Sequence, residues 1–191
     1  AHVVEEEPDE TVEGGAVVSR DPEVSRRVFL YKKFGHVGEE DYIDIGINAK
    51  MSELHAAMGL CVLPKVPEII AARKACSLLY DELLVDLPLA RPAVPAGCEY
   101  NYAYYPVVFA SGEAMMRVRQ ALLGRGIAPR RYFYPSLNTL PYLDPAVRRA
   151  CPVSESVADR VLSLPLYVGL AADEMEVIAG AFSGANSSVL K

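Results

Sequence analysis

The chain has 191 residues, of which 51% are hydrophobic, with a formal net charge of −6 and a pI of about 5.1. This size and apolar content predict a buried core in one domain, or in one domain and part of another. The acidic balance excludes a nucleic-acid-binding or anionic-membrane surface, because no basic stripe is present to neutralise phosphates.

The cysteines and histidines predict neither disulfides nor a metal site. The four cysteines lie far apart without C-x-x-C spacing, and the three histidines form no ligand pattern with them. Cys61 and Cys76 lie in apolar segments and are predicted to be buried thiols of a reduced, cytoplasmic protein. We find no signal peptide and no apolar run that we judge long enough to span a bilayer, so no membrane span is expected.

The first third of the chain predicts a leader, a strand and a helix. Residues 1–12 are acidic and lack hydrophobic periodicity, which is typical of a solvated leader. A short strand is expected at Ala16–Ser19. Residues 21–23 (Asp-Pro-Glu) combine a capping carboxylate with proline at the first helical position, which predicts a helix to about Phe34, closed by Gly35.

The most informative stretch is Tyr42–Leu63, which begins as a loop and continues as a helix. Ser52 is the predicted N-cap, and small residues at 56, 57 and 59 allow another backbone to approach closely. The periodicity alone predicts a core helix. Its apolar residues recur at three- and four-residue spacing: Met51, Leu54, Met58, Cys61 and Val62.

Pro64 and Pro67 are expected to interrupt this helix before a second one over Glu68–Leu84. The proline-rich residues 88–97 are the best candidate for a domain boundary.

The remaining residues predict a small layer of strands and helices. Strands are expected at Tyr100–Phe109, with Pro106 at an edge or bulge, and at Ile127–Tyr134; residues 135–153 are expected to be irregular. Helices are expected over Glu113–Leu123, over Ser154–Leu162 with Ser154 as cap, and over Asp173–Phe182 with Asp173 as cap.

Four literal strings resemble one family. Residues 46–60, GINAKMSELHAAMGL, are similar to the G-x-N-x-[KR]-M-[SN]-E-x-x-A-A-x-G-L segment of the DegT/DnrJ/EryC1/StrS sugar aminotransferases, which depend on pyridoxal phosphate (PLP). Residues 31–35 (YKKFG), 130–137 (RRYFYPSL) and 161–178 (VLSLPLYVGLAADEMEVI) resemble further motifs of that family, in the same order.

This resemblance implies an α/β fold (α+β in the C-terminal part), namely the C-terminal portion of the aspartate-aminotransferase-like PLP-dependent transferase fold, fold type I. A family member would be about twice as long. The implied domains are an acidic leader (1–12), the end of the large PLP domain (13–45), interdomain helices (46–87), a small C-terminal domain (88–184) and a tail (185–191).

The resemblance also locates a departure from the family pattern. The family reads S-x-H-A-T-K-x-x-x-x-x-E-G-G, where the lysine forms the Schiff base with PLP. Setting residues 13–15 on E-G-G places Glu7 at the lysine and Val4 at the histidine. A carboxylate cannot form an imine, so this chain alone is predicted not to transaminate, and no catalytic residue is assigned.

Candidate cofactor-binding residues lie in the G-x-N motif. The family's matching asparagine reaches the PLP phosphate of the neighbouring subunit, which implies that role for Asn48; the alternative is an asparagine that serves its own turn. Lys50 attracts a phosphate or is simply solvated. His55 is expected on the helix surface or at an interface rather than in catalysis.

Candidate substrate-binding residues lie in the RRYFYP motif. Arg131, next to Arg130, offers a guanidinium group to a diphosphate, and Tyr132 and Tyr134 offer rings to a sugar nucleotide. The alternative is a strand whose residues point alternately in and out. Asn138 lies near a position where some relatives carry a substrate-contacting histidine.

The first hypothesis is therefore a PLP-dependent aminotransferase that moves an amino group from an amino acid, commonly glutamate, to a nucleotide-linked keto sugar. It predicts a homodimer or higher oligomer, or a partner chain that supplies the missing N-terminal half. The alternatives are a non-catalytic, degenerate relative acting as an interaction or regulatory module, and a truncated reading frame.

Overall fold

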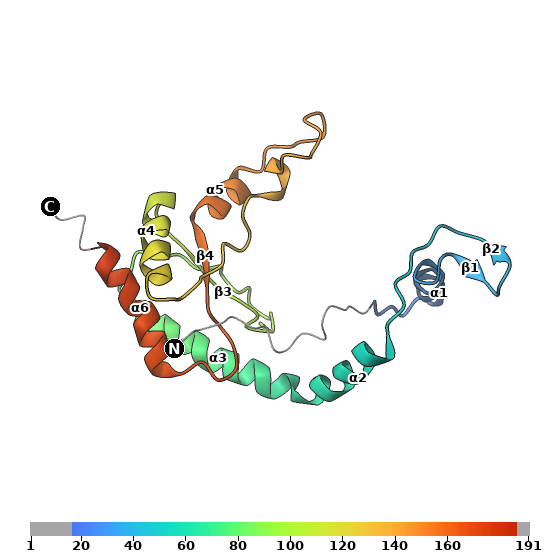
Figure 1. Ribbon diagram of the computed structural model, residues 1–191, viewed down its shortest axis with the longest axis horizontal. Coiled ribbons are helices and arrows are strands. Elements are labelled where there is room, and N and C mark those ends of the chain that lie inside the picture. Colours follow the sequence, from blue (N-terminus) through green and yellow to red (C-terminus); the bar gives the residue numbers. More distant parts are fainter. Residues whose placement is uncertain (1–16, 187–191) are drawn as a thin grey trace. The chain divides into compact units, whose positions relative to one another are not determined.

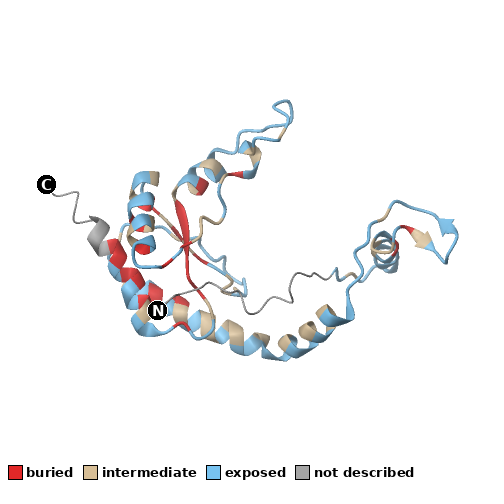
Figure 2. Ribbon diagram, viewed as in Figure 1, coloured by how far each residue is buried: buried red, intermediate tan, exposed pale blue. Residues whose placement is uncertain are grey.

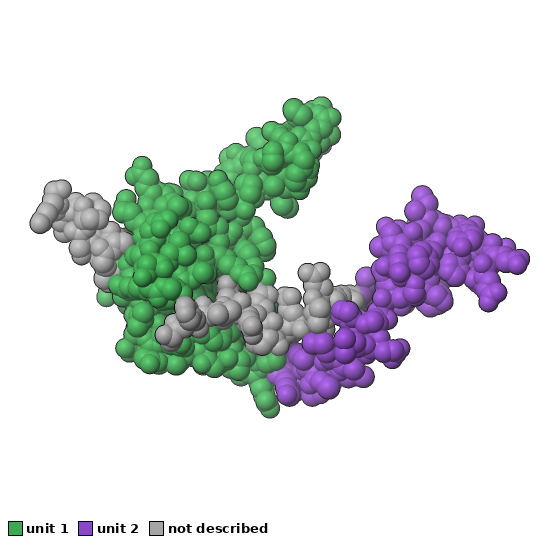
Figure 3. All heavy atoms as spheres, in the orientation of Figure 1, with its two compact units in different colours: residues 1–7, 67–191 green, residues 8–66 purple. Residues whose placement is uncertain are grey.

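The computed structural model describes residues 17–186. Within them, two compact units are found, one of residues 17–66 and the other of residues 67–186 (Figure 3). The acidic leader and Glu7 lie outside the described residues. The domain limits expected from the sequence resemblance remain a prediction.

The unit of residues 17–66 begins with α1 (Pro22–Tyr31), and its capping prediction is confirmed. The Asp21 side chain accepts a hydrogen bond from the Glu23 N–H at 2.9 Å, and Pro22 takes the first helical position. The helix ends at Tyr31, three residues earlier than predicted, and Gly35 follows with a φ of +75°.

The strand predicted at Ala16–Ser19 is wrong for its described part. Residues 17–19 are irregular, because no described segment pairs with them. A short antiparallel hairpin forms after α1, where β1 (His36–Val37) pairs with β2 (Asp41–Tyr42) (Figure 1).

Helix α2 (Glu53–Val62) has the predicted cap, since the Ser52 hydroxyl oxygen accepts from the His55 N–H at 3.3 Å. The prediction of a core helix is not met within the described residues, because no residue of α2 is buried (Figure 2). The predicted burial of Cys61 is wrong for the same reason, while Cys76 is half-buried. Because α2 is apolar and none of its residues is buried, we expect another protein surface to cover it.

The predicted interruption after α2 is confirmed at Pro64, where a 3₁₀ turn separates α2 from the second predicted helix, whereas Pro67 lies inside that helix. Helical residues continue through a 3₁₀ turn, η1 (Leu63–Lys65), into α3 (Val66–Leu83). Pro64 is the second residue of η1, and Pro67 is the second residue of α3. In the first turn of a helical element, the missing N–H of proline costs no hydrogen bond.

The helical stretch from α2 through α3 also contradicts the expectation that no apolar segment is long enough to span a bilayer. Among the described residues, Glu53–Leu83 is long and apolar enough to cross a membrane by length and composition alone. That is weak evidence for a span, because the core helix of a water-soluble protein meets the same criterion.

The unit of residues 67–186 is built on an antiparallel pair, β3 (Tyr105–Val108) and β4 (Val161–Leu164), in which Tyr105 lies opposite Leu164. All four residues of β4 are buried, whereas β3 alternates between buried and half-buried (Figure 2). Side chains from α3, α4 (Gly112–Leu123) and α6 (Ala172–Asn186) complete the core. The largest fully buried members include Tyr80, Tyr105, Met115, Leu122, Leu162, Met175, Ile178 and Phe182.

Pro106 lies on the side of β3 that does not bond to β4. Its partner in register is Ser163, whose N–H and C=O both bond to Arg130 on the opposite side. Proline removes no ladder hydrogen bond there, which agrees with the edge position expected from the sequence.

One predicted strand is absent, and one predicted helix ends earlier than expected. The strand expected at Ile127–Tyr134 is wrong, because only Arg130 makes a strand-like pair, with Ser163. The helix expected over Ser154–Leu162 is α5 (Pro152–Arg160), and its last two predicted residues belong to β4. Val161 and Leu162 leave the helix because their burial against β3 outweighs their helix propensity.

Two predicted caps are also corrected. Cys151, rather than Ser154, stands at the N-cap of α5 and makes no side-chain cap bond. Asp173 lies inside α6, and the side chain of Glu174 reaches back to the Ala171 N–H at 3.0 Å. Between α4 and α5, residues 135–151 are irregular except for the 3₁₀ turn η2 (Leu137–Thr139), and the expected irregular stretch ends two residues early because α5 begins at Pro152.

The two large buried phenols of this core have hydrogen-bond partners. The Tyr80 hydroxyl donates to the Pro165 carbonyl at 3.0 Å, and the Tyr105 hydroxyl donates to Asp81 at 2.8 Å. Burial raises the pKa of both phenols, so both are neutral donors. Ser77 is 1% exposed, and its hydroxyl finds no partner among the described residues.

We predict that Ser77→Ala stabilises the protein by about 1 kcal/mol, because it removes a buried hydroxyl without a partner. Chemical denaturation followed by circular dichroism measures the change. Ser156→Ala, on the exposed surface of α5, is the matched control and should gain less. A loss of stability in Ser77→Ala would mean that the hydroxyl has a partner.

Candidate functional site

The segment that carries the G-x-N motif lies against the end of α1. The Phe34 N–H donates to the Ile47 carbonyl at 3.1 Å, and the Ile47 N–H donates to the Tyr31 carbonyl at 2.8 Å. A Cβ atom on Gly46 would lie 2.2 Å from the backbone nitrogen of Gly35, so only glycine fits. At Gly35, where φ is +75°, a Cβ atom would lie 1.9 Å from the Asp44 carbonyl oxygen, so glycine is needed there as well.

The same backbone pairing places Asn48 and Lys50. Asn48 forms an antiparallel bridge with Lys33, and its Oδ1 accepts from the Lys50 ammonium at 2.6 Å. That ammonium also lies 4.2 Å from the centre of the Phe34 ring. Both side chains are exposed, so the amide Nδ2 and the ammonium offer donors to a ligand.

These donors suit one part of PLP, its phosphate. An amide N–H group and an ammonium are both donors to phosphate oxygens, and the N-cap of α2, Ser52, lies four residues after Asn48. Glu7, which the family alignment sets at the position of the Schiff-base lysine, lies outside the described residues.

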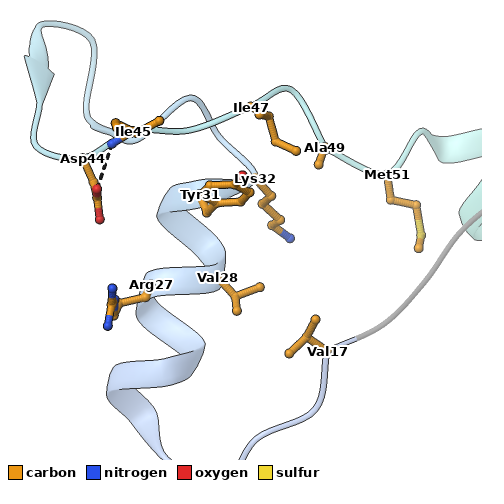
Figure 4. A pocket seen from close by; sticks show the side chains of 10 residues that line it. All are labelled: Val17, Arg27, Val28, Tyr31, Lys32, Asp44, Ile45, Ile47, Ala49 and Met51. Carbon is orange, nitrogen blue, oxygen red and sulfur yellow. Dashed lines mark hydrogen bonds between the residues drawn. The ribbon is translucent and has the colours of Figure 1, made fainter. Parts of the chain in front are cut away.

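A groove of about 910 Å³ lies beside this segment, between α1 and residues 44–51 (Figure 4). Most of its lining is apolar, and the backbone turns at Asp44, whose carboxylate accepts from the Ile45 N–H at 2.8 Å. The sequence analysis did not predict this groove. Its lining residues are Val17, Arg27, Val28, Tyr31, Lys32, Asp44, Ile45, Ile47, Ala49 and Met51.

The predicted substrate-binding residues lie in the other unit. The Arg131 guanidinium lies 3.5 Å from the centre of the Tyr134 ring. It also donates to the carbonyls of Ala158 and Asp159, at 3.4 and 3.2 Å, where α5 ends. Arg131 is therefore held over Tyr134 by α5, and Tyr134 itself is 53% exposed.

Tyr132 belongs to an aromatic cluster. Its hydroxyl accepts from the Arg130 guanidinium, and its ring meets the Tyr104 ring edge-on at 5.5 Å. Its other neighbour is Phe133, stacked on it at 4.8 Å with 12° between the ring planes. The bonds between Tyr132 and Phe133 and between Tyr134 and Pro135 are cis. Sequence reasoning did not select Phe133, although it lies inside the RRYFYP motif.

Asn138 and His55 both make local structural contacts. The Asn138 amide donates to the Arg149 carbonyl at 2.8 Å and to Glu155 at 2.6 Å, which joins the long loop after η2 to α5. The His55 Nδ1 lies 2.5 Å from the Ser52 hydroxyl at the cap of α2. Among residues 17–186, no group of three or more His, Cys, Asp or Glu side chains is arranged to hold a metal ion.

The chain belongs to the DegT/DnrJ/EryC1/StrS aminotransferase family, which it matches over residues 10–183. Solved structures of sugar aminotransferases have the same fold, that of the type I PLP-dependent transferases. The solved structure of DesI in the presence of its TDP-sugar product is 30% identical, with a TM-score of 0.81 over 94% of this chain and 48% of that chain.

Several curated relatives are named as transaminases of nucleotide-linked sugars. The chain is 35% identical to dTDP-4-amino-4,6-dideoxy-D-glucose transaminase of Escherichia coli, over 83% of this chain and 44% of the relative. It is 31% identical to dTDP-4-dehydro-2,3,6-trideoxy-D-glucose 4-aminotransferase of Saccharopolyspora spinosa, over 92% and 49%. The chain thus spans about half the length of the curated relatives it matches.

The contacts of Glu155 generate a pH prediction. The Cys151 N–H donates to its carboxylate at 2.8 Å, and this bond, followed by the one from Asn138, lowers the pKa of Glu155. A lowered folded-state pKa stabilises the fold above the ordinary glutamate pKa of about 4.3. That contribution is lost as the pH falls through the lowered value.

We expect the melting temperature of the wild type to fall more steeply below about pH 4.3 than that of Glu155→Gln. Glu176→Gln, on the exposed side of α6, is the control and should retain the steeper fall of the wild type. Thermal melts between acidic and neutral pH measure this. Equal slopes for the wild type and Glu155→Gln would contradict the assignment.

Proposed function

We propose that this chain forms part of a PLP-dependent aminotransferase that transfers an amino group from an amino acid, with glutamate expected, to a nucleotide-linked keto sugar. Family membership over residues 10–183 carries this proposal. The curated relatives named for aminotransfer on dTDP-linked sugars support the substrate class. We expect such an enzyme to work in the cytoplasm.

In this proposal, Asn48 binds the phosphate of PLP held by a neighbouring subunit, through the Nδ2 donor that its contact with Lys50 leaves available. Lys50 adds positive charge at the same place, and Phe34 beneath its ammonium limits where that charge can lie. When bound, PLP supplies the electron sink for the carbon that exchanges the amino group.

Arg131, Tyr132 and Tyr134 are proposed to contact the sugar nucleotide. Contacts with α5 and the Tyr134 ring orient the Arg131 guanidinium, so that it keeps one direction when it meets a diphosphate. The Tyr132 hydroxyl accepts from Arg130 and Phe133 covers one face of its ring, so the part of the ring that stays accessible is the proposed contact surface.

The Schiff-base lysine is proposed to come from polypeptide other than these 191 residues, because Glu7 takes its aligned position. The assembly would be a homodimer or higher oligomer, or a complex with a chain that supplies the cofactor domain. The unburied apolar helix α2 supports such a covering partner.

A second candidate is a non-catalytic relative that regulates or joins a partner subunit. Glu7 at the lysine position is the observation that favours it. Amino transfer by a completed assembly separates the two candidates.

The test is co-expression of this chain with the polypeptide that supplies the lysine, followed by a glutamate-dependent assay on a dTDP-linked keto sugar. We expect 2-oxoglutarate to form, and Asn48→Ala to weaken PLP binding by about tenfold or more, the usual loss for a hydrogen bond to a charged group. Asn101→Ala, an exposed asparagine whose side chain caps its own turn, should leave PLP binding unchanged.

Absence of amino transfer by an assembly that forms would contradict the proposed function and favour the non-catalytic candidate. Equal PLP affinities for Asn48→Ala and Asn101→Ala would instead remove Asn48 from the phosphate site.

A further inference from the structure

The side chain of Asn138 uses its amide oxygen and both of its amide hydrogens within the protein. The oxygen accepts from the Ser136 hydroxyl at 2.6 Å. The Nδ2 donates to the Arg149 carbonyl at 2.8 Å and to the Glu155 carboxylate at 2.6 Å. An amide carries only two donor hydrogens, so Asn138 has none left for a ligand.

The same network reaches the first turn of α5. Because the Ser136 hydroxyl donates to Asn138, the Ser154 hydroxyl at 2.7 Å is the donor to the Ser136 oxygen. The Glu155 carboxylate also accepts from the Cys151 N–H at 2.8 Å. Ser136 is only 6% exposed, and a buried hydroxyl that both donates and accepts fixes its own backbone segment. Residue 136 is therefore tied to the start of α5.

The other end of this segment is tied to the last turn of α5. Arg131 donates to the carbonyls of Ala158 and Asp159, at 3.4 and 3.2 Å. Tyr134 stands between the two attachments in the sequence, with its ring centre 3.5 Å from the Arg131 guanidinium. Since α5 continues directly into the buried strand β4, both attachments lead to the core of the unit (Figure 1).

Asn138 also holds the long loop that follows η2. The Arg149 carbonyl, which accepts from Asn138, lies at the far end of this loop. Beside it, the Arg148 side chain donates to three backbone carbonyls within residues 140–143, at 3.0 to 3.3 Å, and closes the loop on itself. One amide therefore joins the loop, the start of α5 and residues 131–136.

We propose that Asn138 is a positioning residue, which fixes where Arg131 and Tyr134 meet the substrate. It acts through Ser136 and Glu155 and does not touch the substrate itself. This inference rests on the proposed function for the role of Arg131 and Tyr134 in binding a nucleotide sugar. It adds a supporting network from η2 and α5, outside the segment that would make the contacts.

The first test is steady-state kinetics of the completed assembly on a dTDP-linked keto sugar. Asn138→Asp turns a carboxylate oxygen toward Glu155 and the Arg149 carbonyl, where an amide now donates. We expect the KM for the sugar to rise about tenfold, with kcat and the KM for glutamate unchanged, because only sugar binding is weakened. Adding Glu155→Gln should restore the KM, since the glutamine amide can donate to the new carboxylate.

The second test needs no substrate. Phenylglyoxal modifies accessible arginines of the purified full chain, and peptide mass spectrometry follows Arg131 alone. We expect Arg131 to react about fivefold faster in Asn138→Asp, because a hydrogen bond that limits its movement is lost, and at the wild-type rate in the double variant.

Two further variants complete the design. Asn101→Asp is the matched control, because this exposed asparagine only accepts from the Ala103 N–H, which a carboxylate does equally well, so both measurements should stay at wild-type values. Ser154→Ala removes an exposed hydroxyl and one bond of the network. It should raise the KM for the sugar by about fivefold, and it decides the matter if Asn138→Asp does not fold.

Three results would overturn the inference. Faster modification of Arg131 without a rise in KM would mean that the network only holds the loop. No change in either quantity would remove Asn138 from any positioning role. A fall in kcat at unchanged KM would mean that Asn138 acts on the chemical step.

The outcome is also distinct from that of the proposed function. If the wild-type assembly transfers no amino group, yet Arg131 is modified faster in Asn138→Asp and at the wild-type rate in the double variant, the positioning role stands and the transaminase is rejected. Amino transfer with no effect of Asn138→Asp on KM or on modification would do the reverse.

Discussion

The close approach of two glycines determines what the unit of residues 17–66 can do. Gly46 runs against the backbone of Phe34 and Gly35 with no space for a side chain, and the hydrogen bonds on either side of this contact fix residues 47–49 against the end of α1. Asn48 and Lys50 are presented by that backbone rather than by helix packing. A side chain on Gly46 would therefore displace the candidate phosphate donors without altering either of them.

The unit of residues 67–186 uses a different support for its candidate site. There the buried pair β3–β4 provides the fixed element, and the pairing of Arg130 with Ser163 attaches the RRYFYP segment to it. The helix α5 holds Arg131 through its last carbonyls. Each unit thus places polar or aromatic groups on an irregular segment that a regular element anchors, an arrangement common at binding sites.

Local signals in the sequence predicted the starts of α1 and α2, because caps depend on neighbouring residues: Asp21 and Ser52 act as expected, whereas Ser154 and Asp173 do not cap their helices. They failed where distant contacts decide. Residues 161 and 162 leave the predicted helix because β3 offers them a buried pairing, and Ile127–Tyr134 forms no strand because only Arg130 reaches β4. Family motifs identified Asn48 and Arg131 as candidates, but the exposure of Phe133 and the groove beside α1 depend on three-dimensional packing that no local pattern encodes.

The central claim is that these residues complete a PLP enzyme without carrying its Schiff-base lysine. Its most direct measurement is incubation of the purified chain with PLP, reduction with borohydride, and intact-mass and peptide analysis. The account predicts no stoichiometric PLP adduct on this chain alone, and an adduct on the other polypeptide once the assembly is completed. A stoichiometric adduct on one lysine of this chain would contradict it, because an imine-forming residue would then lie within these 191 residues.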